Sequence, residues 1–195
     1  MIRIFDILFS ALGLIVLSPF LLILYILIRV ESKGGGFYSQ ERIGLNGVPF
    51  KLYKFRTMVV GSDKGSLITV GGRDSRLTRI GYRIRKYKLD ELPQLWNVFV
   101  GDMSFVGPRP EVEKYTRLYT EEQRKVLTVR PGITDWASIK YLDENVILGQ
   151  AEDPDKVYVE QIMLDKIRYN MIWIKNQGIM EYFKIIFVTI VKIFR

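Results

Sequence analysis

An uncharged stretch near the amino terminus is the strongest feature in the pattern of apolar and polar positions. Residues 7–28 contain no charged side chain, and 16 of these 22 residues are Leu, Ile, Val or Phe. As an α-helix with a rise of about 1.5 Å per residue, the stretch would be about 33 Å long, close to the thickness of a bilayer's hydrocarbon core. We therefore predict that it enters a membrane. A cleaved signal peptide is disfavoured, because the apolar run is too long and no small-residue cleavage motif follows it.

Ser18 and Pro19 interrupt this stretch near its middle. A proline inside a helix removes a backbone hydrogen bond and clashes with the preceding turn, so we expect a kink there. Positive charge flanks both ends, with Arg3 before the stretch and Arg29 and Lys33 after it, which favours the cytoplasmic side for both ends. A re-entrant helix that dips into the membrane and returns fits this pattern, and a kinked spanning helix is the alternative that the residues leave open.

The carboxyl-terminal segment, residues 179–195, has an amphipathic pattern. At about 100° per residue its charged side chains share one stripe, and Ile, Phe, Val, Met and Tyr cover the rest. This predicts a helix lying in the membrane interface, and a core helix with one solvated edge is the alternative. The stripe consists of Glu181, Lys184, Lys192 and Arg195.

Between these two segments the pattern predicts an α-rich α+β fold with a small sheet. Asn46 and Gly47 separate two stretches of strand character, residues 37–42 and 48–58, which indicates a short hairpin. A glycine-rich stretch at 61–72 is too irregular for a regular element, and we expect a turn at Pro131-Gly132. Helices are predicted over residues 77–88, 91–100 and 111–127, and over most of the tail from 155 onward.

The composition removes several kinds of chemistry. The chain has no cysteine and no histidine, which excludes disulfides, thiolate nucleophiles and a histidine base or metal ligand. It also lacks the glycine-rich dinucleotide turn and the P-loop lysine motif. Any catalysis must therefore use carboxylates, hydroxyls, Lys, Arg, Tyr or a hard metal ion.

The net charge of +8 is concentrated in one region. Residues 42–88 hold twelve Lys or Arg against Asp63 and Asp74, a local charge of about +10. Such a region suits nucleic acid, anionic lipid headgroups or phosphorylated small molecules, and charge alone does not choose among them. A merely solvated basic face is the simpler interpretation.

Asp90 and Glu91 form a carboxylate pair just ahead of Pro93. In isolation the pair would cap a helix and complement its dipole. Its surroundings suggest more, because Arg and Lys residues precede it and Arg109 lies downstream between Pro108 and Pro110. We expect these cations to lower the carboxylate pKa values and attract phosphate, so that an ionised Asp90 could act as a nucleophile.

Four motifs in order give the chain a resemblance to a known family, over nearly its whole length. With the Ser-Pro break in the anchor, they resemble the bacterial sugar transferases, the small monotopic phosphoglycosyl transferases. The motifs are Lys-Phe-Arg-Thr-Met at 54–58, Leu-Asp-Glu-Leu-Pro-Gln at 89–94, Gly-Asp-Met-Ser-Phe-Val-Gly-Pro-Arg-Pro at 101–110 and Arg-Pro-Gly-Ile-Thr at 130–134.

This resemblance implies an enzyme that transfers a sugar phosphate in two steps. Asp90 would attack the sugar-bearing phosphate of a nucleotide diphosphate sugar, with uridine as the expected base. Polyprenyl phosphate, expected to be undecaprenyl phosphate, would then take the phosphosugar from the aspartyl intermediate. Glu91 would assist the acceptor step or the metal. The metal would be Mg²⁺ with Asp90 as a ligand, which suits a diphosphate beside carboxylates.

The resemblance also assigns places to the other parts of the chain. Lys54, Arg85 and Arg109, the last held by Pro108 and Pro110, match positions near the diphosphate, although each could instead form a surface ion pair. Residues 1–33 would be a re-entrant anchor broken at Ser18-Pro19, 34–178 the catalytic domain and 179–195 the interfacial helix, together one structural unit. The enzyme would start a glycoconjugate pathway at the cytoplasmic face of the bacterial inner membrane.

One region departs from the family pattern. Many relatives have Thr-Gly-Trp-Ala-Gln and then an Asn-Gly-Arg, whereas this chain has Asp135 and Ser138 within that motif and Lys140 after it. Lys140 supplies charge but not a guanidinium fork. The segment through 150–156 resembles an insertion, so recognition of sugar and base is not transferable from this region.

A non-catalytic alternative comes from the basic region alone. The chain would then be a membrane-surface module that binds anionic lipid or nucleic acid, with steep salt dependence and no need for Asp90. The rigid carboxylate and arginine motifs argue against it, so we expect no nucleic-acid partner. A two-fold homodimer is compatible with confinement to a membrane, but no residue requires it.

Overall fold

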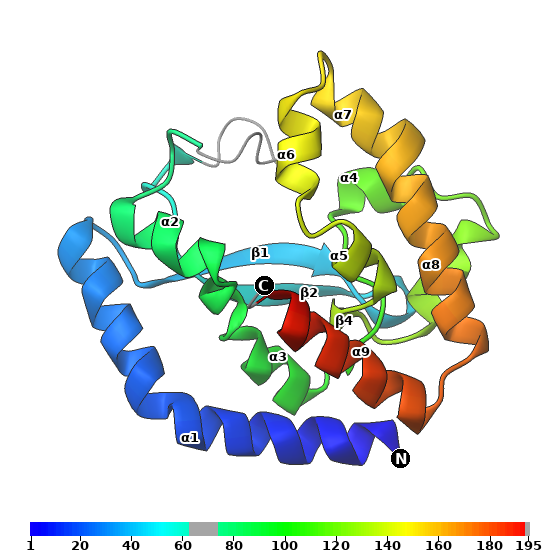
Figure 1. The fold of residues 1–195 in the computed structure, drawn as a ribbon, viewed down its shortest axis with the longest axis horizontal. Helices are drawn as coiled ribbons and strands as arrows, with labels where there is room; N and C mark the ends of the chain where they lie inside the picture. Colours follow the sequence, from blue (N-terminus) through cyan, green and yellow to red (C-terminus); the bar gives the residue numbers. More distant parts are fainter. Residues whose placement is uncertain (63–73, 194–195) are drawn as a thin grey trace.

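The amino-terminal helix borders one whole side of the molecule in the computed structural model, which describes residues 1–62 and 74–193. This helix, α1 (Ile2–Glu31), carries Pro19 in its interior and bends near its middle (Figure 1). The Ser18 hydroxyl donates a hydrogen bond to the Ile15 carbonyl at 2.8 Å within the same turn. The kink predicted at Ser18-Pro19 is therefore confirmed.

Most of the apolar surface of α1 is exposed. Within the described residues it is the one helix long and apolar enough to cross a membrane, and only 11% of its most apolar window is buried. A core helix of a soluble protein would be mostly buried. Leu24 and Ile28 are exceptions, packed against Phe55 and Ile84.

The beginning of α1 is bonded to the rest of the protein. Arg3 donates to the carbonyls of Val98 and Phe99, at 2.5 and 2.8 Å, where α3 (Gln94–Val100) ends. The buried carboxylate of Asp6 accepts three further hydrogen bonds, from the Ser104 hydroxyl, the Phe105 amide and the Tyr182 hydroxyl.

The end of α1 is bonded to the same body. The Glu31 carboxylate accepts a hydrogen bond from the Ile80 amide at 2.9 Å, at the start of α2 (Arg79–Lys86). The buried guanidinium of Arg56 donates to the carbonyls of Ser32, Lys33 and Gly35 at 2.7 to 3.0 Å. Both ends of the bent helix therefore contact one domain.

The predicted hairpin is confirmed at the centre of the molecule (Figure 1). Strand β1 (Phe37–Ile43) pairs antiparallel with β2 (Pro49–Phe55), with Phe37 opposite Phe55. A 3-10 turn, η1 (Leu45–Gly47), joins them, and its Asn46 and Gly47 have φ values of 56° and 77°. Asparagine and glycine tolerate this left-handed backbone best, which explains the hairpin signal.

The helix predicted over 77–88 is confirmed as α2, whereas the next one begins later than expected. A 3-10 turn, η3 (Leu89–Glu91), holds Asp90 and Glu91, and α3 starts only at Gln94 with Pro93 before it. Asp90 therefore does not cap this helix. Most of the glycine-rich stretch at 61–72 lies outside the described residues.

Two predictions in the middle of the chain are wrong. The segment expected to be a helix over 111–127 contains only the short α4 (Glu113–Thr116) and the 3-10 helix η4 (Gln123–Thr128). Pro131-Gly132, expected as a turn, leads into β4 (Gly132–Thr134), which pairs parallel with β3 (Ser104–Val106). Strands of three residues are too short to show a two-residue period.

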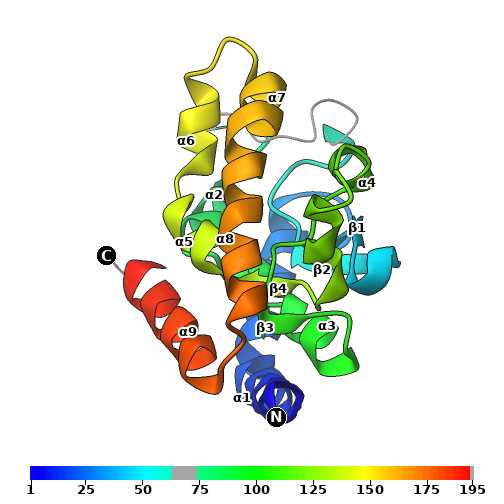
Figure 2. The same ribbon diagram turned by 90° about the vertical axis from the view of Figure 1, so that its right-hand side faces the viewer.

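The helical tail is confirmed. Helix α8 (Met163–Lys175) lies along the end of the molecule that faces the viewer in Figure 2, whereas α9 (Ile179–Ile193) turns back toward the centre (Figure 1). Apolar residues of α8 pack on Val112, Tyr115 and Val126, and those of α9 pack with Trp173 and Val106. The tail follows two unpredicted short helices, α5 (Trp136–Lys140) and α6 (Glu144–Gly149), and consists of α7 (Pro154–Val157), a π-helical turn η5 (Tyr158–Ile162), α8 (Met163–Lys175) and α9 (Ile179–Ile193).

Helix α9 has one buried and one exposed apolar side. Tyr182 and Ile185 are fully buried, whereas several large apolar residues are exposed. Exposed apolar residues of this kind are expected where another phase, such as lipid, covers the surface. The exposed set on this helix is Met180, Phe183, Phe187, Ile190 and Val191. Arg195, part of the predicted charged stripe, lies outside the described residues.

Candidate active site

Asp90 is a buried carboxylate with an unpartnered oxygen. Lys88 has a left-handed backbone, with φ of 56°, and this turns the chain sharply out of α2 and into η3. Asp90 follows with only 6% of its surface exposed, and its Oδ1 has no hydrogen-bond partner in the described protein. A buried acceptor without a partner is costly, so its presence in the folded protein indicates a functional position.

Glu91 joins two of the predicted phosphate-binding cations. Lys54 of β2 donates to its Oε1 at 3.1 Å. Arg109 donates to both carboxylate oxygens, Nη1 to Oε2 at 3.3 Å and Nη2 to Oε1 over a short contact. The carboxylate is thus held by a guanidinium fork and an ammonium at once. Residues from three separate parts of the sequence meet here.

The two neighbouring carboxylates have opposite shifts in pKa. Burial opposes ionisation of Glu91, but the charges of Arg109 and Lys54 outweigh it and hold its pKa well below the ordinary value. Burial and the adjacent Glu91 charge raise the pKa of Asp90, against the pull of Lys54, Arg85 and Lys88. The prediction that nearby cations lower the carboxylate pKa therefore holds for Glu91 and is wrong for Asp90.

Lys54 and Arg85 complete the cationic side of the site. Burial lowers the pKa of Lys54, and the Glu91 charge opposes that shift. Arg85, on α2, lies near enough to stabilise the ionised form of Asp90. The structure thus brings together Lys54, Arg85, Asp90, Glu91 and Arg109, whereas Ser18 and Pro19 lie apart, at the bend of α1.

The loop that carries Arg109 is pressed against β4. The Gly107 amide donates to the Thr134 carbonyl at 3.0 Å, and the Gly132 amide donates to the Pro108 carbonyl at 2.9 Å. A Cβ atom on Gly132 would lie 2.1 Å from the Gly107 nitrogen. The loop that carries Arg109 could therefore not lie this close to β4 if residue 132 had a side chain. The two prolines are buried and fix the backbone on either side of Arg109.

Three further residues support this region, and the sequence interpretation did not single them out. Asn97 bonds the backbone of Tyr53 and Lys51, which joins α3 to β2. Arg42 of β1 donates to the Pro110 carbonyl at 3.1 Å. Arg56 donates to backbone carbonyls of the residues that follow α1. Only Arg56 could have been found from the sequence, because it lies within the motif at 54–58.

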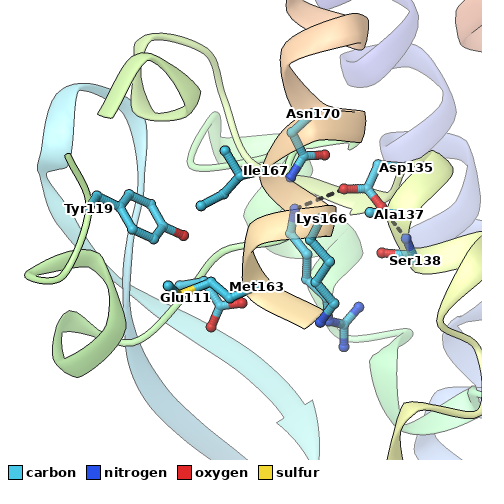
Figure 3. Close-up of a pocket in the computed structure, with 10 residues that line it drawn as sticks. Glu111, Tyr119, Asp135, Ala137, Ser138, Met163, Lys166, Ile167 and Asn170 are labelled. Carbon is cyan, nitrogen blue, oxygen red and sulfur yellow. Dashed lines mark hydrogen bonds between the residues drawn. The ribbon is translucent and has the colours of Figure 1, made fainter. Parts of the chain in front are cut away.

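Asp135 is the most buried of the carboxylates near Arg109, with 1% exposure. Its two oxygens accept hydrogen bonds from the Arg109 amide and the Ser138 amide, and the second contact caps α5 (Figure 3). Burial raises the pKa of Asp135, and the Ser138 hydrogen bonds and Lys166 oppose the shift. Lys140, in contrast, pairs with Asp165 of α8 at 2.6 Å.

A small cavity lies beside Asp135 (Figure 3). Its lining includes Arg109, Ser138, Lys166 and Asn170, but not Asp90. The cavity volume is about 10 Å³, which is room for about one water molecule. This cavity is therefore too small for a sugar nucleotide, and the candidate site is the carboxylate and cation cluster around Asp90 and Glu91.

Comparison with known proteins gives a consistent picture. The family model described as bacterial sugar transferase matches residues 1–195. The chain is 36% identical over 193 residues to the UDP-glucose:undecaprenyl-phosphate glucose-1-phosphate transferase of Klebsiella pneumoniae, covering 97% of this chain and 39% of that protein. It is 36% identical over 188 residues to the UDP-N-acetylgalactosamine-undecaprenyl-phosphate N-acetylgalactosaminephosphotransferase of Aeromonas hydrophila, covering 95% of this chain and 41% of that one.

A third relative is nearer in length. The chain is 46% identical over 138 residues to the uncharacterized sugar transferase EpsL of Bacillus subtilis, covering 70% of this chain and 67% of that protein. The chain therefore spans about two fifths of the length of the Klebsiella and Aeromonas relatives and two thirds of the Bacillus one.

Proposed function

This chain belongs to the bacterial sugar transferase family, and we propose that it transfers a sugar 1-phosphate from a UDP-sugar to undecaprenyl phosphate. The names of the Klebsiella and Aeromonas relatives give this type of donor and this acceptor, with different sugars. The observation that carries the proposal is the buried Asp90 oxygen, which has no partner among residues 1–62 and 74–193, next to a Glu91 that is bound by Arg109 and Lys54.

In the first step, a carboxylate oxygen of Asp90 attacks the sugar-bearing phosphorus of the donor. The bond from that phosphorus to the oxygen bridging the two phosphates breaks, and UMP leaves with the electron pair. The product on the protein is an acyl phosphate that carries the sugar. Burial favours this chemistry because a poorly hydrated carboxylate is a stronger nucleophile once it is ionised, and Lys54, Arg85 and Lys88 favour ionisation.

In the second step, a phosphate oxygen of undecaprenyl phosphate attacks the same phosphorus. The bond from phosphorus to the Asp90 oxygen breaks, which restores the carboxylate and yields undecaprenyl diphosphate sugar. Glu91 supports both steps by holding Arg109 and Lys54 in place. In phosphoryl transfer the protein mainly positions groups and neutralises charge, and these two cations are suited to that task.

Magnesium is part of the proposal, and the residues present fit it as an ion shared with substrate. Asp90 offers an unpartnered carboxylate oxygen, whereas both oxygens of Glu91 are bound by cations. Across residues 1–62 and 74–193, no group of three or more acidic side chains could hold a metal alone. Mg²⁺ commonly binds through one or two carboxylates together with substrate phosphates and water, and it neutralises phosphate charge there.

The proposed test is UMP release by the full chain in nanodiscs, with a panel of UDP-sugars and undecaprenyl phosphate. We expect one or a few sugars to give UMP and lipid-linked phosphosugar in equal amounts. Chelation of divalent ions should reduce the rate to background, and added Mg²⁺ should restore it. If no UDP-sugar gives lipid product while the protein binds anionic vesicles, the non-catalytic interpretation is correct.

The anchor is proposed to be re-entrant, at the cytoplasmic face of the inner membrane. Two observations support this topology: α1 bends at Pro19, and both its ends bond to the same domain, through Arg3 and Asp6 at one end and Glu31 at the other. A spanning helix would put those ends on opposite sides of the bilayer. The exposed apolar side of α9 is proposed to lie in the same interface.

The absence of cysteine makes this topology testable. We expect single cysteines placed after Met1, at Lys33 (Lys33→Cys) and at Glu121 (Glu121→Cys) to react alike with an impermeant maleimide. None should be labelled in intact spheroplasts, and all three should be labelled in inverted vesicles. The Glu121 position reports the side of the catalytic domain. Labelling of the amino-terminal cysteine alone in spheroplasts would show a spanning helix instead.

A further inference from the structure

The main-chain end and the guanidinium end of Arg109 are held by two different carboxylates. Glu91 accepts both hydrogen bonds that the guanidinium fork donates to it. Asp135 accepts a hydrogen bond from the Arg109 backbone amide at 3.3 Å. The first contact faces the proposed phosphate site, whereas the second fixes the chain from which the side chain extends.

The segment that contains Asp135 holds the loop at several points. The Thr134 carbonyl accepts from the Gly107 amide at 3.0 Å, and the Ile133 carbonyl lies 3.5 Å from Nη1 of Arg109. Both are backbone groups, so any residue at 133 or 134 could supply them. Asp135 differs because its contact uses the side chain, and it therefore depends on the residue type.

A carboxylate suits this position because two N–H groups converge on it. The Arg109 amide and the Ser138 amide each donate to a different oxygen of Asp135, and the side chain is almost fully buried. Serine or asparagine at this position could accept from Ser138 as an ordinary helix cap. Each would offer only one acceptor atom there, and the partly buried Arg109 amide would lose its partner.

We propose that Asp135 is a positioning residue for the phosphate-binding arginine: it fixes the backbone at Arg109 so that the guanidinium fork is aligned with Glu91 and the donor diphosphate. The inference rests on the function proposed above for Arg109. It assigns to Asp135 a task beyond capping α5. Asp135 would act through Arg109, because its hydrogen bonds go to the Arg109 and Ser138 amides and not to Asp90 or Glu91.

Asp135→Asn and Asp135→Ser test the proposal, because both keep an acceptor for the Ser138 amide. Asp153→Asn is the matched control, since Asp153 caps α7 through the Lys156 amide at 3.0 Å in the same way. We expect each Asp135 variant to lower kcat/KM for the UDP-sugar about tenfold, and the control to stay within twofold. Melting temperatures of the Asp135 variants should lie close to that of the control variant.

The decisive measurement is a double-mutant cycle with Arg109→Lys. If Asp135 acts through the guanidinium fork, Asp135→Asn should cost about tenfold in the wild-type background and less than twofold in the Arg109→Lys background. Equal losses in both backgrounds would overturn the proposal. So would a loss that follows the melting temperature in both Asp135 variants, because Asp135 would then only stabilise the fold.

A binding measurement separates this inference from the proposed function. Titration with UDP, which has the diphosphate but no sugar, should show about tenfold weaker binding in Asp135→Asn and no change in Asp153→Asn. Wild-type protein that binds UDP but releases no UMP from any UDP-sugar would reject the proposed function and leave this comparison intact. Unchanged UDP affinity in Asp135→Asn, with an active wild type and unchanged kcat/KM, would reject the positioning role.

Discussion

Asp90→Asn is expected to lower UMP release by at least about 10³-fold, because an amide cannot form the acyl phosphate. The substitution is nearly isosteric, so the buried position should remain filled and the protein should stay membrane-bound. Incubation of wild-type protein with UDP-sugar and no lipid acceptor should add the mass of one phosphosugar, and added UMP should remove it. The Asp90→Asn protein should show no such adduct by mass spectrometry after rapid quench.

Asp155→Asn is a suitable control for this variant. Asp155 forms an exposed ion pair with Lys114 at 2.6 Å and takes no part in the site, so its loss should change the rate less than twofold. Full activity of Asp90→Asn would reject Asp90 as the nucleophile. Normal UMP release by wild-type protein without any adduct at early times would favour direct transfer between the two substrates.

The pKa of Asp90 adds a pH signature to the same experiment. Burial and Glu91 raise this pKa above the ordinary value of about 4, and only the ionised form can attack phosphorus. As pH falls through the raised pKa, the reactive fraction and the rate should fall together. The acid limb of the wild-type profile should therefore lie above the range of an exposed aspartate.

The parts of the fold that follow local signals could be predicted from the sequence. The long apolar helix, its bend at Pro19 and the hairpin turn at Asn46-Gly47 each depend on a few adjacent residues with strong conformational preferences. Asp90, Glu91 and Arg109 stood out because carboxylates and arginine are grouped in short motifs, whereas Lys54 and Arg85 were assigned by the resemblance to the family. A cationic pocket was expected around Asp90, and in the structure Lys54 and Arg109 bond to the adjacent Glu91.

The failures have a common physical cause, which is dependence on distant parts of the chain. Strands β3 and β4 pair Ser104 with Gly132, and neither three-residue segment has a period of its own. The segment over 111–127 has helix-forming residues, yet packing around Tyr115 and Val126 limits it to short turns. Tertiary packing commonly overrides helix propensity in this way.

Burial is the other quantity that the sequence could not supply. Nearby cations suggested low pKa values for both carboxylates. Among the described residues no cation forms an ion pair with the buried Asp90, whereas two cations bond to the partly buried Glu91. Desolvation therefore prevails at Asp90, and the charges prevail at Glu91. The contact of Asp135 with Arg109 was hidden for the earlier reason, because it depends on the pairing of β3 with β4, two segments distant in the sequence.

Arg109→Lys should lower kcat/KM for the UDP-sugar by about 10² to 10³, although the positive charge is kept. Arginine donates to both oxygens of Glu91 from a rigid fork, and lysine can supply only a single point charge on a flexible chain. The variant would leave one oxygen of the partly buried Glu91 without its guanidinium contact and would misalign the proposed phosphate contact. Stopped assays with excess enzyme would measure the residual rate.

Arg117→Lys provides the matched control for the arginine substitution. Arg117 pairs with Glu113 at 2.8 Å across one helical turn, and 73% of its side chain is exposed, so solvent screens the pair. Replacing this arginine by lysine should therefore leave kcat/KM for the UDP-sugar nearly unchanged. A rate for Arg109→Lys within threefold of wild type would mean that charge alone is sufficient at position 109, and the fork held between Glu91 and the Asp135 segment would have no catalytic purpose.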